Sequence, residues 1–177
     1  MGLSASSGKR RRRVRFLEKH LYTIENMANS FVQIYIHLIF HVKSTGVTMA
    51  SADLPRIFTY IGGIIRKLGG MSIIVGGMTD HVHSLSSLPK TMSMSDFART
   101  IKAESSKWIK KLHPSYLRFA WQDGYGAFSV SPSLIEKTKD YINNQEKHHK
   151  VRSFREELKA ILEAYGVEYD EKYLLGE

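Results

Sequence analysis

Residues 71–88 read MSIIVGGMTDHVHSLSSL and predict two β-strands joined by a tight turn. Two runs rich in apolar residues, 71–78 and 81–88, are separated by Thr79-Asp80. Successive side chains of a strand point to opposite faces, so His81 and His83 project together while Val82 points the other way. The second strand therefore presents two imidazoles at one place and packs an apolar side chain into the core.

The segments on both sides of this strand pair predict an alternation of strands and helices. Apolar residues recur at every second position in the strands and at three- and four-residue intervals in the helices. The predicted elements are a strand at 31–42, a helix at 52–68, the two strands above, a helix from Ser93 to about Leu112, a strand at 119–122 and 127–130 that Gly124-Tyr125-Gly126 interrupts, and helices at 131–149 and 154–165. This order predicts an α+β fold, a ferredoxin-like split βαββαβ antiparallel sheet with helices on one face, followed by a C-terminal helix.

The helix predicted over 131–149 carries a second group of candidate functional residues. Ser131 can cap its start, and Pro132 suits the first helical position because its missing N–H would be unpaired there. Tyr141 and Gln145 lie one turn apart and face the same neighbour. Tyrosine can form a covalent phosphoester with a nucleic-acid phosphate, and a glutamine carbonyl can complete a metal shell begun by two histidines. Both residues could instead only border the apolar stripe of the helix.

The two histidines of the 81–88 strand are candidate metal ligands for phosphodiester chemistry. Imidazole binds borderline divalent ions well, and a strand holds both ligands rigidly. A histidine pair of this kind can also be two solvated polar residues on a sheet surface. His37 and His41 share one face of the first strand, but we leave both out of the metal set because hydrogen-bonded structural histidines are common.

These residues belong to an ordered series of short motifs. The series is QIYIHLIF at 33–40, GMTDHVH at 77–83, SMSDF at 93–97, KAESSKW at 102–108, WQDGYGAFS at 121–129 and YINNQEKHH at 141–149. Over about residues 28–175 the chain resembles the single-tyrosine transposases of the His-hydrophobic-His endonuclease superfamily, including their REP-associated relatives. It differs at Ser84, where relatives often carry an aliphatic residue, and at Thr79, where many carry proline.

The resemblance implies a function for each of these groups. His81, His83 and Gln145 match the family's ligands for Mg²⁺ or Mn²⁺, and Tyr141 matches its nucleophile. The implied reaction is cleavage and rejoining of single-stranded DNA by metal-assisted transesterification through a 5′-phosphotyrosine intermediate. The expected partners are single-stranded DNA, including hairpin ends of an insertion sequence, and a second copy of the chain. In that homodimer each nucleophile helix would pack over the partner's histidines, giving composite sites in the prokaryotic cytosol. Asp80 and Glu104 are candidates for assisting deprotonation of the tyrosine.

The charge of the chain favours a polyanionic partner. The formal net charge is +9, and residues 1–26 carry +5 of it, from seven basic and two acidic residues. We expect 1–26 to be a basic, disordered leader and 27–177 to be the catalytic domain. A basic face on the 93–112 helix could follow a DNA backbone or could simply be solvated; it consists of Arg99, Lys102, Lys107, Lys110 and Lys111. The absence of cysteine suits a reducing cytosol, and no apolar run is long enough to cross a membrane.

Two other classes of protein remain open at this point. A catalytically inactive or domesticated nucleic-acid-binding protein of the same fold would keep the sheet and the basic helix face without needing both histidines, Tyr141 and Gln145. A hydrolytic RNA phosphodiesterase would use a His-x-Ser/Thr pair on each of two similar strands. Only His113-Pro114-Ser115 has that form, and its proline is a poor strand residue.

Overall fold

The computed structural model of the chain describes residues 31–44, 47–149, 151–171 and 174. The predicted leader at 1–26 lies outside these residues. The chain divides into two units, 1–32 and 33–177, and the elements below all belong to the second. None of the helices in the described ranges has the length and apolar character needed to span a membrane.

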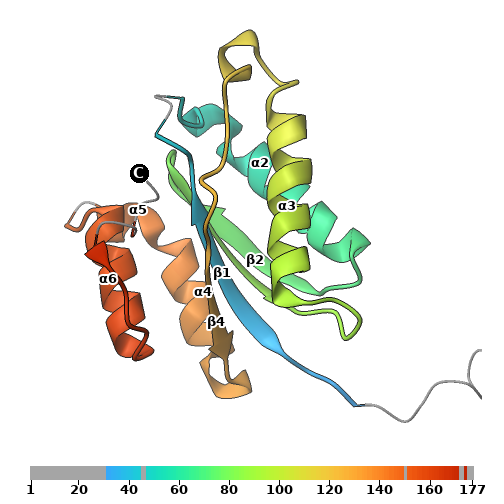
Figure 1. Cartoon of the computed structure of the whole chain (residues 1–177), viewed down its shortest axis with the longest axis vertical. Helices are drawn as coiled ribbons and strands as arrows, with labels where there is room; N and C mark the ends of the chain where they lie inside the picture. The colour runs from blue at the N-terminus through green and yellow to red at the C-terminus, as the bar shows by residue number, and fades with distance from the viewer. Residues whose placement is uncertain (1–30, 45–46, 150, 172–173, 175–177) are drawn as a thin grey trace, which may run out of the picture. The chain divides into compact units, whose positions relative to one another are not determined.

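A four-stranded antiparallel sheet forms the centre of the second unit (Figure 1). Its strands are β1 (Tyr35–His41), β2 (Ser72–Gly77), β3 (His81–Ser87) and β4 (Gly126–Val130), in the order β2-β3-β1-β4. Each neighbouring pair is antiparallel. This is the strand order of a split βαββαβ unit, so the predicted fold class is confirmed.

Two helices cover one face of this sheet and enclose the main hydrophobic core. They are α2 (Leu54–Lys67), which a 3₁₀ turn at Ser51–Asp53 precedes, and α3 (Met94–Ile109). Their buried side chains pack against those of β1 and β3; examples are Ile61 and Ile101 against Leu38, Phe40 and Val82. Ser93 caps α3, because its hydroxyl accepts a hydrogen bond from the backbone N–H of Asp96 at 3.1 Å.

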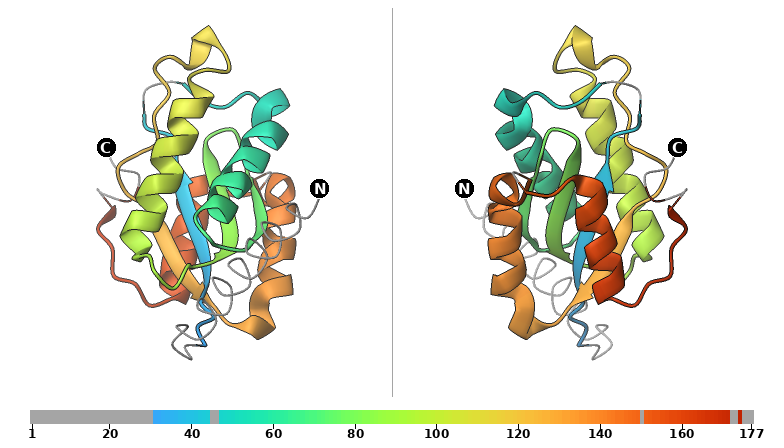
Figure 2. Two further views of the ribbon diagram at one scale, coloured as in Figure 1. Left: turned by 90° about the vertical axis from the view of Figure 1, so that its right-hand side faces the viewer. Right: turned by 90° about the vertical axis from the view of Figure 1, so that its left-hand side faces the viewer.

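The C-terminal helices cover the opposite face, as the two views of Figure 2 show. They are α4 (Ile135–Asn143), α5 (Gln145–His149) and α6 (Phe154–Ala164). The predicted continuous helix at 131–149 is wrong in this respect: it begins with a 3₁₀ turn at Pro132–Leu134 and is interrupted at Asn144. The side-chain amide of Asn144 donates to the carbonyl of Asp140 at 2.7 Å, a local bond that competes with regular helix continuation.

A close contact between β2 and α4 brings Tyr141 near the histidine strand. A Cβ atom added at Gly76 would lie 2.8 Å from the Ile142 side chain and 3.1 Å from its carbonyl oxygen. Any larger residue at position 76 would therefore push α4 away from the sheet. Glycine here lets the helix that carries the candidate nucleophile pack directly on the strand next to β3.

The segment before β4 differs from its prediction. Residues 119–122 form no strand; Trp121 makes one isolated bridge with Val42, and β4 begins at Gly126. The indole N–H of Trp121 donates to the hydroxyl of Ser105 at 2.9 Å, and Lys102 donates to the carbonyls of Asp123 and Gly124 at 2.9 and 2.8 Å. Side chains of α3 thus hold this segment in place, together with two backbone hydrogen bonds to the end of β1, from Lys43 to Ala120 and from Gln122 to His41.

Replacing Ser84 with alanine is expected to stabilise the protein. Ser84 is completely buried, and its hydroxyl has no hydrogen-bond partner among the described residues. Such a buried hydroxyl costs about 1–3 kcal/mol, so Ser84→Ala should raise the free energy of unfolding by about 1 kcal/mol in urea titrations. Ser105→Ala is the matched control. It should lower the free energy of unfolding, because Ser105 donates to the carbonyl of Ile101 and accepts from Trp121. A decrease for Ser84→Ala would contradict the assignment.

Candidate metal centre and nucleophile

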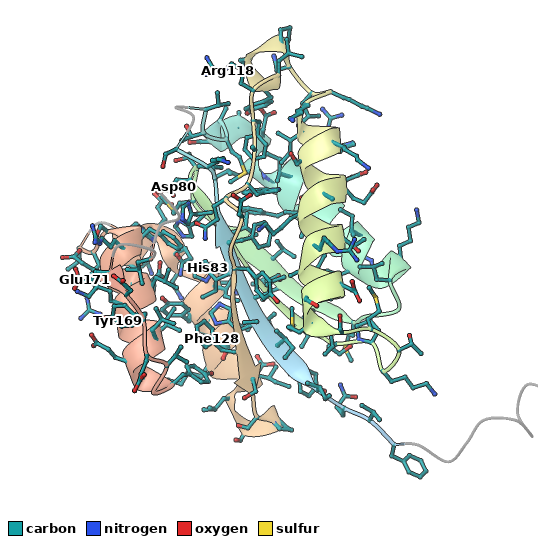
Figure 3. The ribbon with its side chains drawn as sticks, in the orientation of Figure 1. Asp80, His83, Arg118, Phe128, Tyr169 and Glu171 are labelled. Carbon is teal, nitrogen blue, oxygen red and sulfur yellow. The ribbon has the colours of Figure 1, made fainter. Side chains whose placement is uncertain are left out.

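The side chains of His81 and His83 are both completely buried on the face of the sheet that the C-terminal helices cover. Their ring centroids are 5.0 Å apart. Figure 3 shows His83 between the sheet and these helices. The alternative that the pair is solvated on the sheet surface is therefore wrong. Buried imidazoles need specific partners, and those partners indicate what the two rings can bind.

His81 is held between a carboxylate and an amide. Its Nδ1 donates to Asp80 Oδ1 at 2.7 Å, and this bond holds the pKa of Asp80 below its usual range. A neutral His81 then presents a lone pair at Nε2, yet Gln145 Oε1 lies 3.1 Å from that atom. The amide is oriented this way because its Nε2 donates to Glu157 at 2.7 Å. Two lone pairs that face each other at this distance need a proton or a cation between them.

His83 offers an unpaired nitrogen to the same place. Its Nδ1 lies 2.9 Å from Nε2 of His37 on β1, and its own Nε2 is buried without a hydrogen-bond partner among the described residues. Burial lowers the pKa of His83, and it lowers the pKa of His37 to about 3, so His37 is neutral near pH 7 and burial disfavours protonation of His83. When His83 donates from Nδ1 to His37, the lone pair on its Nε2 is available to a metal ion.

Glu157 on α6 is the residue of this site that the sequence prediction missed. Its carboxylate oxygens lie 3.8 Å from His81 Nε2 and 3.7 Å from His83 Nε2, and the candidate ligand atoms of the three residues all lie within 4.8 Å of one another. Glu157 is 5% exposed. It lies three residues after Phe154 and next to Leu158, within the apolar stripe of α6. A charged residue in such a stripe was the available signal.

Glu157 remains charged despite its burial. Burial raises the pKa of its carboxyl group, but His83 and the hydrogen bonds from Tyr141 and Gln145 outweigh that effect and bring the pKa below its ordinary value. His149 Nε2 lies 3.0 Å from the second carboxylate oxygen. The donor set is thus two imidazole nitrogens, one carboxylate and one amide oxygen. Nitrogen and oxygen ligands of this kind fit Mg²⁺ less closely than Mn²⁺, which accepts imidazole more readily.

Tyr141 reaches this centre through Glu157. The Tyr141 hydroxyl donates to Glu157 Oε1, the oxygen that also accepts from Gln145. Its ring packs edge-on to His83 with centroids 6.0 Å apart. Burial, followed by the bond to Glu157, raises the pKa of Tyr141 above its usual range. The structure therefore brings together the four predicted residues His81, His83, Tyr141 and Gln145, from β3, α4 and α5.

The two proton acceptors suggested by the sequence do not contact the tyrosine. Asp80 bonds to His81, and Glu104 pairs with Lys107 on α3, the helix on the other face of the sheet. Among the described residues, Glu157 is the carboxylate that touches the Tyr141 hydroxyl. It therefore holds the phenol by a hydrogen bond in this structure.

The predicted basic face lies away from Tyr141. Arg99 pairs with Asp96, and Lys102 binds the backbone before β4; Lys110 and Lys111 are exposed just beyond the end of α3. A different set of cationic or titratable side chains lines a cleft of about 710 Å³ that includes Tyr141. These residues are Lys137, His148, His149 and Arg152. The sequence prediction treated His148 and His149 only as helix-terminal residues.

The metal-free protein is expected to lose stability in acid. The pKa of buried His37 is about 3, against 6.5 in the unfolded chain, so between these values the unfolded state binds a proton that the folded state does not. Stability therefore falls as the pH falls, by about 2 kcal/mol at pH 5 from His37 alone. The lowered pKa values of His41 and His83 act in the same direction.

Urea unfolding in EDTA at about pH 7.5, 6.5 and 5 measures this effect. His37→Gln removes one titrating group and should reduce the pH dependence. Equal stability across this pH range would contradict a neutral, buried His37.

Comparisons with known proteins identify the family of the chain. A family model described as "Transposase IS200 like" matches residues 30–145, more than half of the 177 residues. The fold is similar to that of a candidate transposase from Deinococcus radiodurans R1, with a TM-score of 0.52 and 20% identity over 67% of this chain and 95% of that one. It is also similar to a REP-associated tyrosine transposase bound to a REP hairpin, with a TM-score of 0.51 and 13% identity over 70% of this chain and 73% of that one. No curated protein sequence was found to match significantly. The extent of the family match confirms the resemblance in the sequence: the chain belongs to the IS200-like transposases, a family of DNA-processing enzymes.

Proposed function

We propose that the chain cleaves and rejoins single-stranded DNA by transesterification, with Tyr141 as the nucleophile. The main support is that the Tyr141 hydroxyl and the Nε2 atoms of both His81 and His83 converge on the carboxylate of Glu157. A phosphate bound at this point would lie against a nucleophile, a proton acceptor and a set of metal ligands.

The proposed reaction exchanges one ester bond of the phosphate for another. The phenolic oxygen of Tyr141 bonds to phosphorus as the bond from phosphorus to the 3′ oxygen breaks. This leaves a 5′-phosphotyrosine and a free 3′-hydroxyl. The phenolic proton moves to Glu157 and from there, through water, to the departing 3′ oxygen, so no net proton is gained or lost. A second 3′-hydroxyl then attacks the phosphotyrosine and releases Tyr141, so strands are rejoined without ATP.

A divalent ion fits the donor set of this site. His81, His83, Glu157 and the Oε1 of Gln145 would hold Mg²⁺ or Mn²⁺, which would polarise the scissile phosphate and stabilise the charge that develops on its oxygens. Asp80 and His37 orient the two imidazoles through hydrogen bonds at 2.7 and 2.9 Å. Glu157 accepts hydrogen bonds from Tyr141 and Gln145 and so holds both side chains close to the two imidazole rings.

The cleft beside Tyr141 fits a DNA strand. Lys137 and Arg152 line it, and they would contact phosphates on either side of the cleaved bond. The neighbour of known structure that binds a REP hairpin supports a structured DNA end as substrate. We therefore propose single-stranded DNA with a hairpin close to the cleavage point as the substrate class.

End-labelled single-stranded DNA from the regions that flank the gene tests this proposal. With Mn²⁺, a 3′ label should stay attached to the protein on a denaturing gel, whereas a 5′ label should appear on a shorter, free strand that ends in a 3′-hydroxyl. The duplex form of the same DNA is the control and should give no adduct. DNA binding without any adduct would favour the inactive nucleic-acid-binding protein of the same fold.

The RNA phosphodiesterase alternative has no support in the structure. His113 precedes a 3₁₀ turn at Pro114–Tyr116 and lies outside the four strands of the sheet. It therefore cannot supply one of two equivalent strand-borne histidines.

In the predicted homodimer, the two halves of each site come from different chains. Within one chain, α4 already brings Tyr141 to Glu157 and His83. The same contacts can form between two copies that exchange their C-terminal helices. The shared-site dimer thus remains a prediction of the family resemblance.

Mixing two inactive variants tests that prediction. If sites are shared, chains with His81→Ala and His83→Ala should regain adduct formation when mixed with Tyr141→Phe chains, because a heterodimer would contain one intact composite site. Absence of rescue, with subunit exchange demonstrated by a labelled partner, would favour a site completed within one chain.

A further inference from the structure

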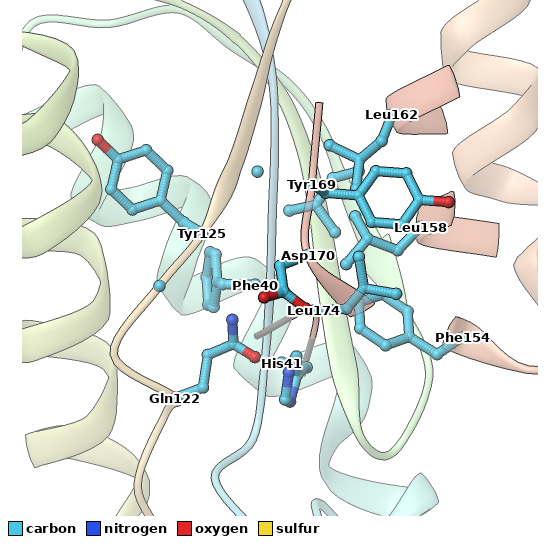
Figure 4. A pocket seen from close by; sticks show the side chains of 13 residues that line it. Phe40, His41, Gln122, Tyr125, Phe154, Leu158, Leu162, Tyr169, Asp170 and Leu174 are labelled. Atoms are coloured by element: carbon cyan, nitrogen blue, oxygen red, sulfur yellow. The ribbon is translucent and has the colours of Figure 1, made fainter. Parts of the chain in front are cut away.

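A second cavity lies close to the metal centre and takes no part in the chemistry described so far (Figure 4). Its volume is about 280 Å³, at the small end of the range for ligand sites. Strand β1, the segment before β4, α6 and the chain after α6 contribute its walls. Phe154, Leu158, Leu162 and Tyr169 make much of the lining apolar. A space of this size and character suits one flat, aromatic group.

Two polar atoms on this lining lack partners. His41 and Gln122 are each 8% exposed, and neither His41 Nε2 nor Gln122 Oε1 has a hydrogen-bond partner among the described residues. They belong to adjoining positions, because the backbone N–H of Gln122 donates to the carbonyl of His41 at 2.9 Å. His41 Nδ1 donates to the carbonyl of Val42 at 2.6 Å, so in the neutral ring Nε2 is an acceptor.

Buried acceptors without donors are costly, and they are seldom kept unless ordered water or a ligand satisfies them. Here the two acceptors are an imidazole nitrogen and an amide oxygen of two residues that line one cavity, whose lining also includes Asp170. The complementary group is an N–H donor on a planar, mostly apolar molecule. Nucleobases have this character: their faces stack on aromatic or aliphatic side chains, and their edges carry the donors.

The cavity is separated from the metal centre by a single ring. Phe154 lines the cavity and also stacks on His81, with ring centroids 4.4 Å apart and planes inclined by 18°. His41 and His81 are directly paired across β1 and β3. A nucleotide next to the cleaved phosphate is therefore within reach of the cavity when the strand is unpaired. Tyr125, which is 38% exposed, lines the same cavity and offers a further stacking surface.

We propose that this cavity receives one unstacked base of the DNA strand beside the cleavage point, and that His41 and Gln122 select a base with an exocyclic amino group. Adenine, cytosine and guanine carry such a group, whose two N–H bonds can serve both acceptors, whereas thymine has a single N–H donor on its pairing edge, at N3. The inference rests on the proposed function for its substrate, and it adds a base-reading site to that function. It assigns Gln122 a role in specificity rather than in catalysis.

Binding of free nucleosides tests the cavity independently of DNA cleavage. The metal-free protein, kept in EDTA without DNA, is titrated with deoxyadenosine, deoxycytidine, deoxyguanosine and thymidine. The NMR signals of the His41 ring and the Gln122 side-chain amide are followed. At least one amino-bearing nucleoside should shift both signals and bind about tenfold more tightly than thymidine, the ratio expected for one satisfied pair of buried groups. Equal binding of thymidine, or no shift at these residues with any nucleoside, would overturn the proposal.

Variants then connect the cavity with the DNA strand. Gln122→Leu should remove the preference over thymidine, whereas Gln33→Leu, the same change at an exposed glutamine, should leave it intact. Leu162→Trp fills the cavity and should abolish nucleoside binding; circular dichroism confirms that each variant is folded. A series of oligonucleotides, each with one abasic site at a different position, is then compared. An abasic site at one position beside the cleavage point should lower the affinity for DNA about tenfold. In Gln122→Leu the same abasic site should lower the affinity by much less.

The outcomes separate this inference from the proposed function. Nucleoside binding without any covalent DNA adduct would retain the cavity and reject the cleavage reaction. An adduct formed by a protein whose cavity binds no nucleoside, and whose DNA has no abasic-sensitive position, would retain the reaction and reject the cavity.

Discussion

Replacing Tyr141 with phenylalanine is expected to abolish covalent attachment to DNA, with a loss of at least about 1,000-fold in the rate of adduct formation. The variant lacks the only oxygen that can form the phosphotyrosine, and no neighbouring hydroxyl replaces it among the described contacts of Glu157. The phenylalanine ring can still pack against His83 and His148, as the tyrosine ring does. The fold and the affinity for uncut DNA should therefore be nearly unchanged.

Tyr60→Phe is the matched control for this experiment. Tyr60 lies on α2, which covers the other face of the sheet, and its ring stacks on Trp108. It should form the adduct at the rate of the unaltered protein. Mapping the DNA-linked peptide to a tyrosine other than Tyr141, or undiminished adduct formation by Tyr141→Phe, would reject the assignment of the nucleophile.

Removing either histidine of the β3 pair is expected to produce the second large effect. His81→Ala and His83→Ala should each weaken Mn²⁺ binding and slow cleavage by about 100-fold, because each removes one ligand from a small donor set. Affinity for uncut DNA in EDTA should change little. Calorimetry or the electron paramagnetic resonance of Mn²⁺ gives the metal affinity directly. His113→Ala, at an exposed turn, is the control and should bind Mn²⁺ normally.

The same measurement defines the third and fourth ligands. Gln145→Ala and Glu157→Gln should each weaken Mn²⁺ binding, Glu157→Gln by more, because it removes the only charged ligand of the candidate cluster. Glu146→Gln, an exposed carboxylate between them in the sequence, is the control. Normal Mn²⁺ affinity in Glu157→Gln would show that Glu157 contacts the tyrosine but is not a metal ligand. Full cleavage in excess EDTA would reject the metal centre altogether.

The double role of Glu157 makes the site sensitive to its charge. In the structure this carboxylate accepts bonds from Tyr141 and Gln145 and lies close to His149 at 3.0 Å. We propose this carboxylate both as a metal ligand and as the acceptor of the phenolic proton, so its charge should affect metal binding and the ionisation of Tyr141, whose pKa is raised by burial and by Glu157.

Local patterns in the sequence were sufficient for the sheet and for much of the site. Alternation of apolar residues placed β1, β2 and β3 within a few residues of their observed bounds, since one face of each strand must be buried. The same alternation put His81 and His83 on one face, and helical spacing put Tyr141 and Gln145 one turn apart. These relations extend over only a few residues, so the sequence expresses them directly.

Only the tertiary structure decided how these pieces meet. Glu157 follows Tyr141 by 16 residues and lies on a different helix, and nothing in its local spacing specifies that it enters the space between the histidines and the phenol. The break at Asn144 and the contact at Gly76 set the position of α4, and both depend on neighbours distant in the sequence. The burial of His41 and Gln122, each with an acceptor that has no partner among the described residues, likewise follows from tertiary packing. Burial and electrostatics depend on every element packed around a group, and the free energy of each contact is therefore settled by the assembled fold rather than by periodicity along the chain.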